Sequence, residues 1–335
     1  MNFSLTKEQE FVRKMVNEFA KTEVEPLAAD IDKEHRFPME TVEKMAKYGL
    51  MGIPFPTQYG GAGGDHISYA ITVEELAKVC GSTAVIVSAH TSLCCWPIFN
   101  YGTEEQKMKY LPDLLSGKKI GAFGLTEPNA GTDASGQQTT AKLEDGKWIL
   151  NGAKCFITNG GYADTFVVFA MTDKKKGNHG ITAFIVEKGD EGFSIGKTED
   201  KLGIKASSTT ELIFQNCAIP EDRLLGEIGA GFKVALSTLD GGRIGIASQA
   251  LGIAQGAFDV TVEYMGQRKQ FGKKLSQFQA LQFEMADLKT RIEAARLLVY
   301  RAAFLKDQHA PYSEAAAMAK LYAAETAMAV KLLCM

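Results

Sequence analysis

The feature that most constrains the fold is a double change in hydrophobic period along the chain. Apolar residues recur at helical spacing from residue 3 to about 117, alternate with polar residues from 119 to about 226, and return to helical spacing from 229 onward. This order differs from the alternating strands and helices of a parallel dinucleotide-binding sheet. No GxGxxG motif opens a helix after a first strand, and no GxxxxGK[ST] loop occurs. We therefore predict an α+β fold with an N-terminal helical domain (1–118), a middle antiparallel β domain (119–227) and a C-terminal helical bundle (228–335).

Capping signals place several helices. Thr6 to Gln9 forms a capping box before a helix that we expect to end before Pro26, and Thr103 to Gln106 forms one before a helix that we expect to end at Leu115. Further helices are expected at about 40–48, 68–80 and 82–102. The last of these is apolar on nearly all sides, which predicts a position inside the bundle.

Short alternating runs predict the strands of the middle domain, and Glu144 to Trp148 reads as a hairpin turn. The runs are IGAFGL, KWILNG, KCFIT, TFVVFAM, ITAFIVE and TTELIFQN. In the C-terminal segment, an apolar stripe at helical steps must pack against other helices. Its members are Phe278, Leu281, Met285, Leu288, Ile292, Ala295, Val299 and Ala302.

Composition excludes several function classes. The 335 residues carry a net charge of −3, which gives no bias toward nucleic acid, and we see no apolar run of the roughly 18 residues that a membrane span needs. The N-terminus lacks the apolar core of a signal peptide, so we expect a cytoplasmic protein. The six cysteines form no CxxC pair and the histidines are scattered, which favours reduced core thiols and no metal site.

Two motifs of the middle domain combine small residues with hydrogen-bonding groups. TEPNAGTDASG, residues 126–136, follows a buried strand and offers the hydroxyls of Thr126 and Thr132 together with glycines that allow a ligand close to the backbone. A surface loop with ordinary turn chemistry is the alternative. In KCFITNGGYAD, Phe156 and Thr158 pair an aromatic face with a hydroxyl, which suits a ring and its polar edge. The alternative there is a plain strand end.

Two further motifs lie in the C-terminal segment. RKQFGKK places Arg268 and three lysines within seven residues, which suits phosphate groups, although a solvated charge run is the more common explanation. LDGGR, residues 239–243, puts a glycine pair in a helical stretch. Either a ligand lies against that backbone, or two helices pack closely there.

Together, in this order and spacing, the motifs resemble the acyl-CoA dehydrogenase family over the whole chain, and its short-chain, butyryl-CoA branch in particular. The matching segments are LTEPNAGTDASG, KCFITNGG, KGNHGITAFIVE, TLDGGRIGIASQALG and RKQFGKKLSQFQALQF. The resemblance implies FAD as cofactor, a short-chain acyl-CoA as substrate, an electron-transferring flavoprotein as partner, and a homotetramer whose subunits complete one another's FAD sites. It also implies oxidation of the α,β bond to a trans-2-enoyl-CoA, or the reverse reduction.

The resemblance also implies a set of site residues. The FAD ring is expected to meet Phe123, Leu125, Thr126, Thr132, Phe156, Ile157 and Thr158, and the FAD of an adjacent subunit to meet Arg268, Phe271 and Gln279. The acyl-CoA is expected to meet Thr132, Asp240, Gly241, Gly242 and Arg243.

The family's glutamate base has no matching residue in this sequence. In the short-chain branch it lies in a YEGTNE-like segment, which we expect beyond Met335, and the position that some relatives use instead is Gly242. Two explanations stay open: the sequence is a piece of a complete enzyme, or the chain binds FAD and acyl-CoA without efficient proton abstraction. A related oxidase that passes electrons to oxygen is a more remote alternative.

Overall fold

A computed structural model describes residues 3–334. The chain divides into two compact units, which are described separately. Unit 1 contains residues up to 30, 65–85 and 243–334, and unit 2 contains residues 31–64 and 86–242.

The predicted helix starts are confirmed, but the first helical segment does not end before Pro26. Helix α1 (Lys7–Phe19) follows the Thr6 capping box, in which both hydrogen bonds form. A π-helical turn, Ala20–Val24, then leads directly into α2 (Glu25–Lys33). Pro26 lies in the first turn of α2, where a missing N–H is tolerated. The proline therefore marks an irregularity in a continuing helical segment.

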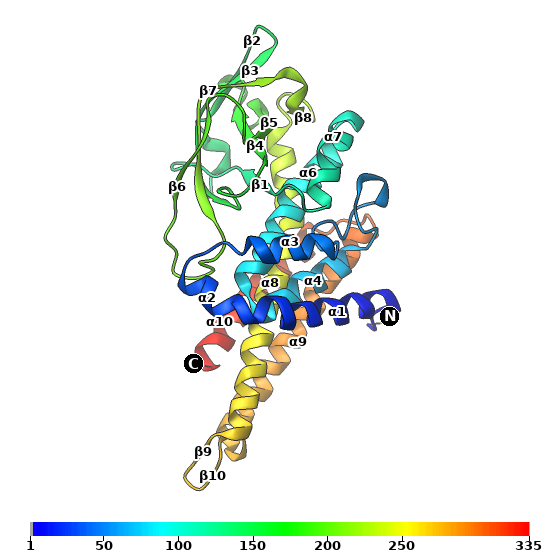
Figure 1. Cartoon of the computed structure of the whole chain (residues 1–335), viewed down its shortest axis with the longest axis vertical. Coiled ribbons are helices and arrows are strands. Elements are labelled where there is room, and N and C mark those ends of the chain that lie inside the picture. The colour runs from blue at the N-terminus through cyan, green and yellow to red at the C-terminus, as the bar shows by residue number, and fades with distance from the viewer. Residues whose placement is uncertain (1–2, 335) are drawn as a thin grey trace. The chain divides into compact units, whose positions relative to one another are not determined.

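Unit 1 is helical around an alanine-rich core. It includes α1 and α4 (His66–Val79), most of α8 (Gly231–Gln267), and α9 (Gln279–Asp307) and α10 (Ser313–Cys334), which pack against each other (Figure 1). The predicted stripe on α9 packs from about Met285 onward, and Leu288, Ile292 and Val299 are fully buried. Leu281, earlier in the stripe, is 36% exposed.

A short hairpin joins α8 to α9 within unit 1. It consists of β9 (Lys269–Gln270), β10 (Lys273–Lys274) and the 3-10 turn Leu275–Gln277. Phe271 and Gly272 form its turn, and both have positive φ. Only these two residues separate the strands, and the Phe271 side chain at the turn is almost fully exposed.

Unit 2 joins short helices to one sheet. The helical elements are α3 (Met39–Lys47), η2 (Thr57–Tyr59), the end of α5 (Gly81–Ala89), the π-helix η3 (His90–Cys95), α6 (Trp96–Tyr101), α7 (Glu104–Leu115) and the start of α8. The second capping box also forms, at Thr103 before α7. Helix 82–102 of the sequence analysis is thus one helical run with a π segment in its middle.

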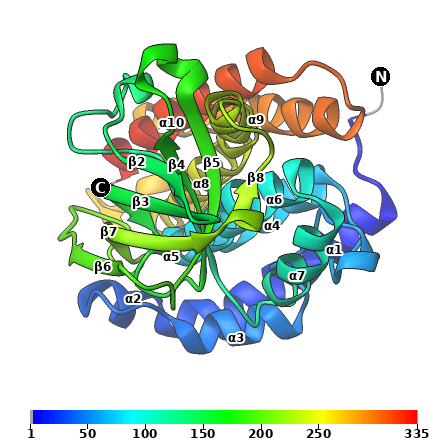
Figure 2. The same ribbon diagram turned by 90° about the horizontal axis from the view of Figure 1, so that it is seen from above.

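The sheet is antiparallel except where β4 pairs with β1 and, at one residue, with β2. Its order is β6-β7-β3-β2-β4-β5-β8, with β1 on β4, and Figure 2 shows β6 and β8 at opposite edges. The strands are β1 (Gly121–Gly124), β2 (Thr140–Glu144), β3 (Lys147–Thr158), β4 (Thr165–Met171), β5 (Ile181–Glu187), β6 (Phe193–Thr198), β7 (Thr209–Pro220) and β8 (Leu224–Leu225). Short 3-10 segments lie at Ala134–Gly136, Lys174–Gly180 and Glu221–Arg223, and the second is interrupted by non-helical backbone at Gly177.

The predicted turn between β2 and β3 is confirmed. Asp145 and Gly146 both have positive φ, as a two-residue hairpin turn requires. The two strands predicted at 147–152 and 154–158, however, are one strand, β3. Its register against β7 shifts between Leu150 and Gly152 and again between Lys154 and Ile157. Gly152 and Ala153, at the predicted break, pair in register with Phe214 and Ile213, and the ladder continues on both sides of them.

One helical run, Gly81–Tyr101, is long and apolar enough to cross a membrane by length and composition. This corrects the expectation that no stretch reaches that length. Of its most apolar window, 78% is buried inside the protein, as in a core helix.

Candidate functional site

The two motifs of the middle domain lie side by side in unit 2. The N–H of Cys155 on β3 donates to the carbonyl oxygen of Thr126, just after β1, at 2.9 Å. Beside it, Lys154 Nζ donates to the carbonyl oxygen of Leu125 at 3.2 Å. Two segments nearly 30 residues apart are therefore tied together where β1 ends and β3 bulges.

The bulge in β3 turns an aromatic side chain outward. Phe156 has a φ of 59°, and its side chain is 62% exposed although both neighbouring residues are buried. A bulky residue with positive φ is strained by about 1–3 kcal/mol, and such strain is common at functional sites. Thr158, two residues later, is half-buried. The arrangement presents a ring and a hydroxyl on the same stretch of strand.

A buried lysine clamps the loop that follows β1. Lys154 is fully buried, and its Nζ contacts Glu127 Oε1 at 2.7 Å and Gln137 Oε1 at 3.0 Å in addition to the Leu125 carbonyl. The Thr139 N–H donates to the same Glu127 oxygen, Oε1, and the Gln138 N–H donates to the other oxygen, Oε2. Both ends of the loop are thus held by one ion pair.

The electrostatics of this pair follow from burial. Desolvation lowers the pKa of Lys154 to about 8, with Glu127 opposing the shift. For Glu127, burial acts to raise the pKa, but Lys154 and the backbone N–H groups outweigh it and hold the pKa below its usual value. Glu127 is therefore an ionised structural group, and Lys154 is a residue whose importance the sequence analysis did not identify.

Between its clamped ends, the loop is open. Thr132 is exposed, and no atom lies within 4 Å of the position that a Cβ on Gly131 would take. Ser135 Oγ donates to Asp133 at 2.6 Å, which orders the turn before β2. The loop can therefore admit a ligand at Gly131 and Thr132 without rearranging its anchors.

Three of the expected ligand residues have side chains that belong to the core. Leu125 and Ile157 are buried, and Phe123 is half-buried with its ring 5.1 Å from that of Phe169. A ligand can meet Leu125 and Ile157 through their backbone only. The exposed members of the predicted set in unit 2 are Phe156 and Thr132, with Thr126 and Thr158 half-buried beside them.

The start of β1 is also anchored by a buried histidine. The Gly121 N–H donates to His90 Nδ1 at 2.9 Å, and Nε2 lies 3.1 Å from the Leu114 carbonyl oxygen. Because Nδ1 accepts, Nε2 must carry the proton, and the ring is neutral. Burial lowers the pKa of His90 to about 4, with the Leu114 hydrogen bond opposing the shift.

The expected acyl-CoA residues, Asp240 to Arg243, occupy one turn of α8. A Cβ on Gly242 would lie 2.8 Å from Leu93 Cδ2 of the π-helix. This supports the close-packing explanation of the glycine pair at Gly242. A larger residue at this position would displace Leu93.

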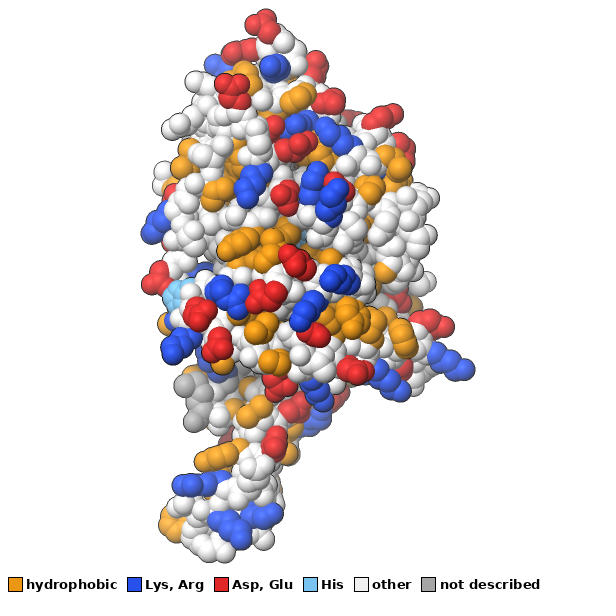
Figure 3. Space-filling view, in the orientation of Figure 1, with side chains coloured by type: hydrophobic (Ala, Val, Ile, Leu, Met, Phe, Trp, Pro, Cys, Tyr) orange, Lys and Arg blue, Asp and Glu red, His pale blue; other side chains and the backbone are white. Residues whose placement is uncertain are grey.

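The remaining predicted residues lie on the hairpin of unit 1. Phe271 is 91% exposed, and Arg268 and Gln279 are exposed as well. Figure 3 shows the cations of this hairpin gathered around apolar atoms at the lower tip. Lys273 Nζ lies 4.2 Å from the centre of the Phe278 ring, a cation–π contact that supports the turn.

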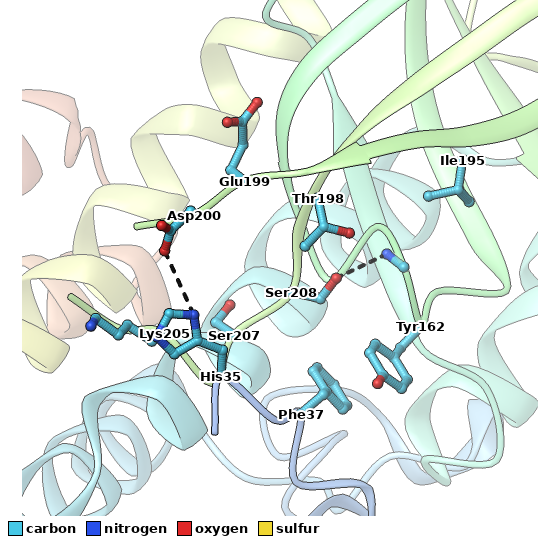
Figure 4. Close-up of a pocket in the computed structure, with 11 residues that line it drawn as sticks. His35, Phe37, Tyr162, Ile195, Thr198, Glu199, Asp200, Lys205, Ser207 and Ser208 are labelled. Carbon is cyan, nitrogen blue, oxygen red and sulfur yellow. Dashed lines mark hydrogen bonds and ion pairs between the residues drawn. The ribbon is translucent and has the colours of Figure 1, made fainter. Parts of the chain in front are cut away.

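A pocket of about 520 Å³ lies near the turn that follows Thr158 (Figure 4). Phe37 and Tyr162 stack at 4.0 Å on one side of it, and His35 Nδ1 lies 3.6 Å from Asp200 Oδ1 on another. The sequence analysis did not identify this pocket, since its lining comes from four separate segments. Among residues 3–334, no cluster of three or more His, Cys, Asp or Glu side chains could hold a metal ion.

Family models match nearly the whole chain. They are the acyl-CoA dehydrogenase N-terminal domain at residues 6–118, the middle domain at 122–217 and the C-terminal domain at 229–335. The short-chain specific acyl-CoA dehydrogenase of Clostridium acetobutylicum is 62% identical over 330 residues, which cover 98% of this chain and 87% of that protein.

Solved structures agree with this assignment. Butyryl-CoA dehydrogenase from Megasphaera elsdenii superposes with a TM-score of 0.98 at 51% identity, over 100% of this chain and 88% of that one. A chain from a study of the electron transferring flavoprotein of Acidaminococcus fermentans gives a TM-score of 0.99 at 56% identity, with the same coverage. These matches show that the chain belongs to the acyl-CoA dehydrogenase family.

Proposed function

We propose that this protein oxidises a short-chain acyl-CoA, butyryl-CoA to crotonyl-CoA, or reduces the enoyl-CoA in the reverse direction, and that it exchanges electrons with an electron-transferring flavoprotein. As a member of its family it is an FAD-dependent oxidoreductase acting on acyl-CoA. The observation that carries the assignment to this site is the strained, exposed Phe156 beside the open loop after β1. An aromatic side chain held outward at such cost needs a planar partner.

The residues of unit 2 fit a flavin ring. Phe156 would cover one face, the Thr158 hydroxyl would donate to the ring edge, and Thr126 would bind the pyrimidine side. Thr132, at the open part of the loop, would lie near the phosphates. FAD supplies the hydride acceptor when it is bound, and the chain's own groups hold it and exclude water.

For the substrate, we propose the α8 turn from Asp240 to Arg243. Gly242 lets this turn pack closely on Leu93, and the flanking charged side chains of Asp240 and Arg243 suit the polar part of CoA. A base must also remove the α-proton, and the thioester oxygen must be hydrogen-bonded as negative charge develops.

We infer a homotetramer in which Arg268, Phe271 and Gln279 reach the FAD of an adjacent subunit. The support is that all three side chains are exposed, with Arg268 and Phe271 on the hairpin between α8 and α9. We also propose that the chain has three domains, which meet between residues 118 and 119 and between residues 227 and 228, and that the protein is cytoplasmic.

The identity of the base separates two candidate functions. Glu127 is committed to Lys154, and Gly242 stands at the alternative position of the base. We propose that a glutamate beyond residue 335 serves as base. The second candidate is a protein that binds FAD and acyl-CoA without abstracting the α-proton, and the observation that favours it is the pairing of Glu127 with Lys154.

One anaerobic titration tests both candidates. The purified protein is reconstituted with FAD, and butyryl-CoA is added while the flavin absorption is followed. Bleaching, with crotonyl-CoA formed, supports the dehydrogenase. A shifted but unbleached spectrum favours the binding protein, and failure to retain FAD refutes both. Rapid peroxide formation in air without an acceptor protein would instead indicate an oxidase.

A further inference from the structure

A buried asparagine connects the segments that meet at the proposed flavin edge. Asn159 follows Thr158 directly, is fully buried, and has a φ of 67°. Asparagine is among the few residues that tolerate this left-handed conformation. The residue lies at the end of β3, where the chain turns away from the sheet.

The side chain of Asn159 reaches two other elements of unit 2. Its Nδ2 donates to the carbonyl oxygen of Gly121 at the start of β1, at 3.3 Å, and to that of Ile86 on α5, at 3.1 Å. With both donors used in this way, Oδ1 is buried without a partner among the described residues. The reverse amide orientation would place Oδ1 against two carbonyl oxygens, so the contacts determine the orientation.

The backbone of Asn159 is equally engaged. Its N–H donates to the carbonyl oxygen of Ser208 at 2.8 Å, and its own carbonyl oxygen accepts from the N–H groups of Tyr162 and Ala163. Gly161 donates to Ser208 Oγ at the same turn (Figure 4). The turn after Thr158 is therefore held from the side of β7 as well as from β1.

These bonds have one geometrical effect. The Gly121 N–H donates to His90, and the Gly121 carbonyl oxygen accepts from Asn159. Since β1 leads in four residues to Leu125 and Thr126, and Asn159 is covalently joined to Thr158, one amide group links the two sides of the proposed ring site.

We propose that Asn159 is the positioning residue that holds the Thr158 hydroxyl in register with the end of β1, and thereby sets FAD affinity. It touches neither cofactor nor substrate in this proposal and acts through Thr158. The inference rests on the proposed function, because it requires a flavin between these segments.

The decisive variant is Asn159→Gly, since glycine tolerates the left-handed backbone and removes the side chain that carries the amide. We expect the dissociation constant of FAD to rise about tenfold, from the loss of two buried hydrogen bonds that hold the site. The visible absorption band of the bound flavin should also shift. Asn159→Asp keeps the shape and loses the donors, and should weaken FAD binding at least as much.

The matched control is Asn216→Gly. Asn216 is also a left-handed asparagine of the same sheet, with a φ of 49°, but it is exposed. It should leave the FAD affinity within twofold of wild type. In a Thr158→Val background, Asn159→Gly should have a smaller effect than in wild type, because the group through which it acts is already gone.

The outcomes of these experiments distinguish a failure of the Asn159 inference from a failure of the proposed function on which it rests. A wild-type protein that cannot hold FAD refutes the proposed function and this inference with it. If wild type binds FAD, and both Asn159 variants lose stability while their FAD affinity and flavin spectrum match wild type, Asn159 is structural only and the inference is wrong. Full additivity with Thr158→Val would also overturn it.

Discussion

Removing the charge of Lys154 should destabilise unit 2 strongly. In Lys154→Met, the Glu127 carboxylate stays 5% exposed and loses its cationic partner, and the Leu125 carbonyl loses its donor. Breaking a buried ion pair from one side costs about 3–5 kcal/mol. For a unit of this size that corresponds to a fall in melting temperature of roughly 6–20 °C.

The assay can be confined to unit 2, because both tryptophans of the chain, Trp96 and Trp148, lie in it. Urea unfolding of the apoprotein followed by tryptophan fluorescence therefore reports on this unit. Lys142→Met is the matched control, an exposed lysine on neighbouring β2, and should change the unfolding free energy by less than about 0.5 kcal/mol.

The double variant Lys154→Met/Glu127→Gln shows whether the stability loss comes from the unpaired Glu127 charge or from lost packing. A neutral glutamine carries no unpaired charge, and its one oxygen can still accept from either the Gln138 or the Thr139 N–H, so the double variant should recover about 1–3 kcal/mol relative to Lys154→Met. The reasoning is refuted if the single variant loses less than about 1 kcal/mol, or if the second substitution gives no recovery.

Three other substitutions test features described above, at Phe156, His90 and Tyr300. Phe156→Gly should stabilise the apoprotein by about 1 kcal/mol in urea, because strain at positive φ is released, while FAD binding weakens; equal stability would contradict the strain argument. The pKa of His90 is about 4 in the folded protein, below its unfolded value of about 6.5, so unit 2 should lose stability as pH falls from about 6.5 to about 4. His90→Gln should make the free energy of unfolding less dependent on pH in this range. An unchanged pH profile would show that His90 does not cause the dependence. In unit 1, Tyr300 donates to Glu74 at 2.6 Å and accepts from Arg13, so Tyr300→Phe should lower the unfolding free energy by about 1–3 kcal/mol by calorimetry, and a neutral result would show that water replaces the hydroxyl.

Much of the chain's organisation is determined by local sequence. The capping boxes at Thr6 and Thr103 start their helices because side chains three residues apart satisfy N–H groups of the first turn. The Asp145-Gly146 pair forms its hairpin because both residues tolerate positive φ. The resemblance to the acyl-CoA dehydrogenase family predicts a ring site that includes Phe156 and Thr158, whereas the residue types alone left a plain strand end open.

Only the tertiary structure determined where the side chains of the candidate site point and which partners they bind. The hydrophobic pattern of residues 147–158 predicts two strands. In the structure these residues form one strand paired with β7, and a bulge in it turns Phe156 outward. Lys154 and Asn159 resemble an ordinary strand lysine and an ordinary turn asparagine in the sequence. They become anchors because folding places Glu127 and Gly121, more than 25 residues away, within hydrogen-bond distance. Local sequence selects conformations of a few residues, but a buried polar group takes its role from partners that only the folded chain brings to it.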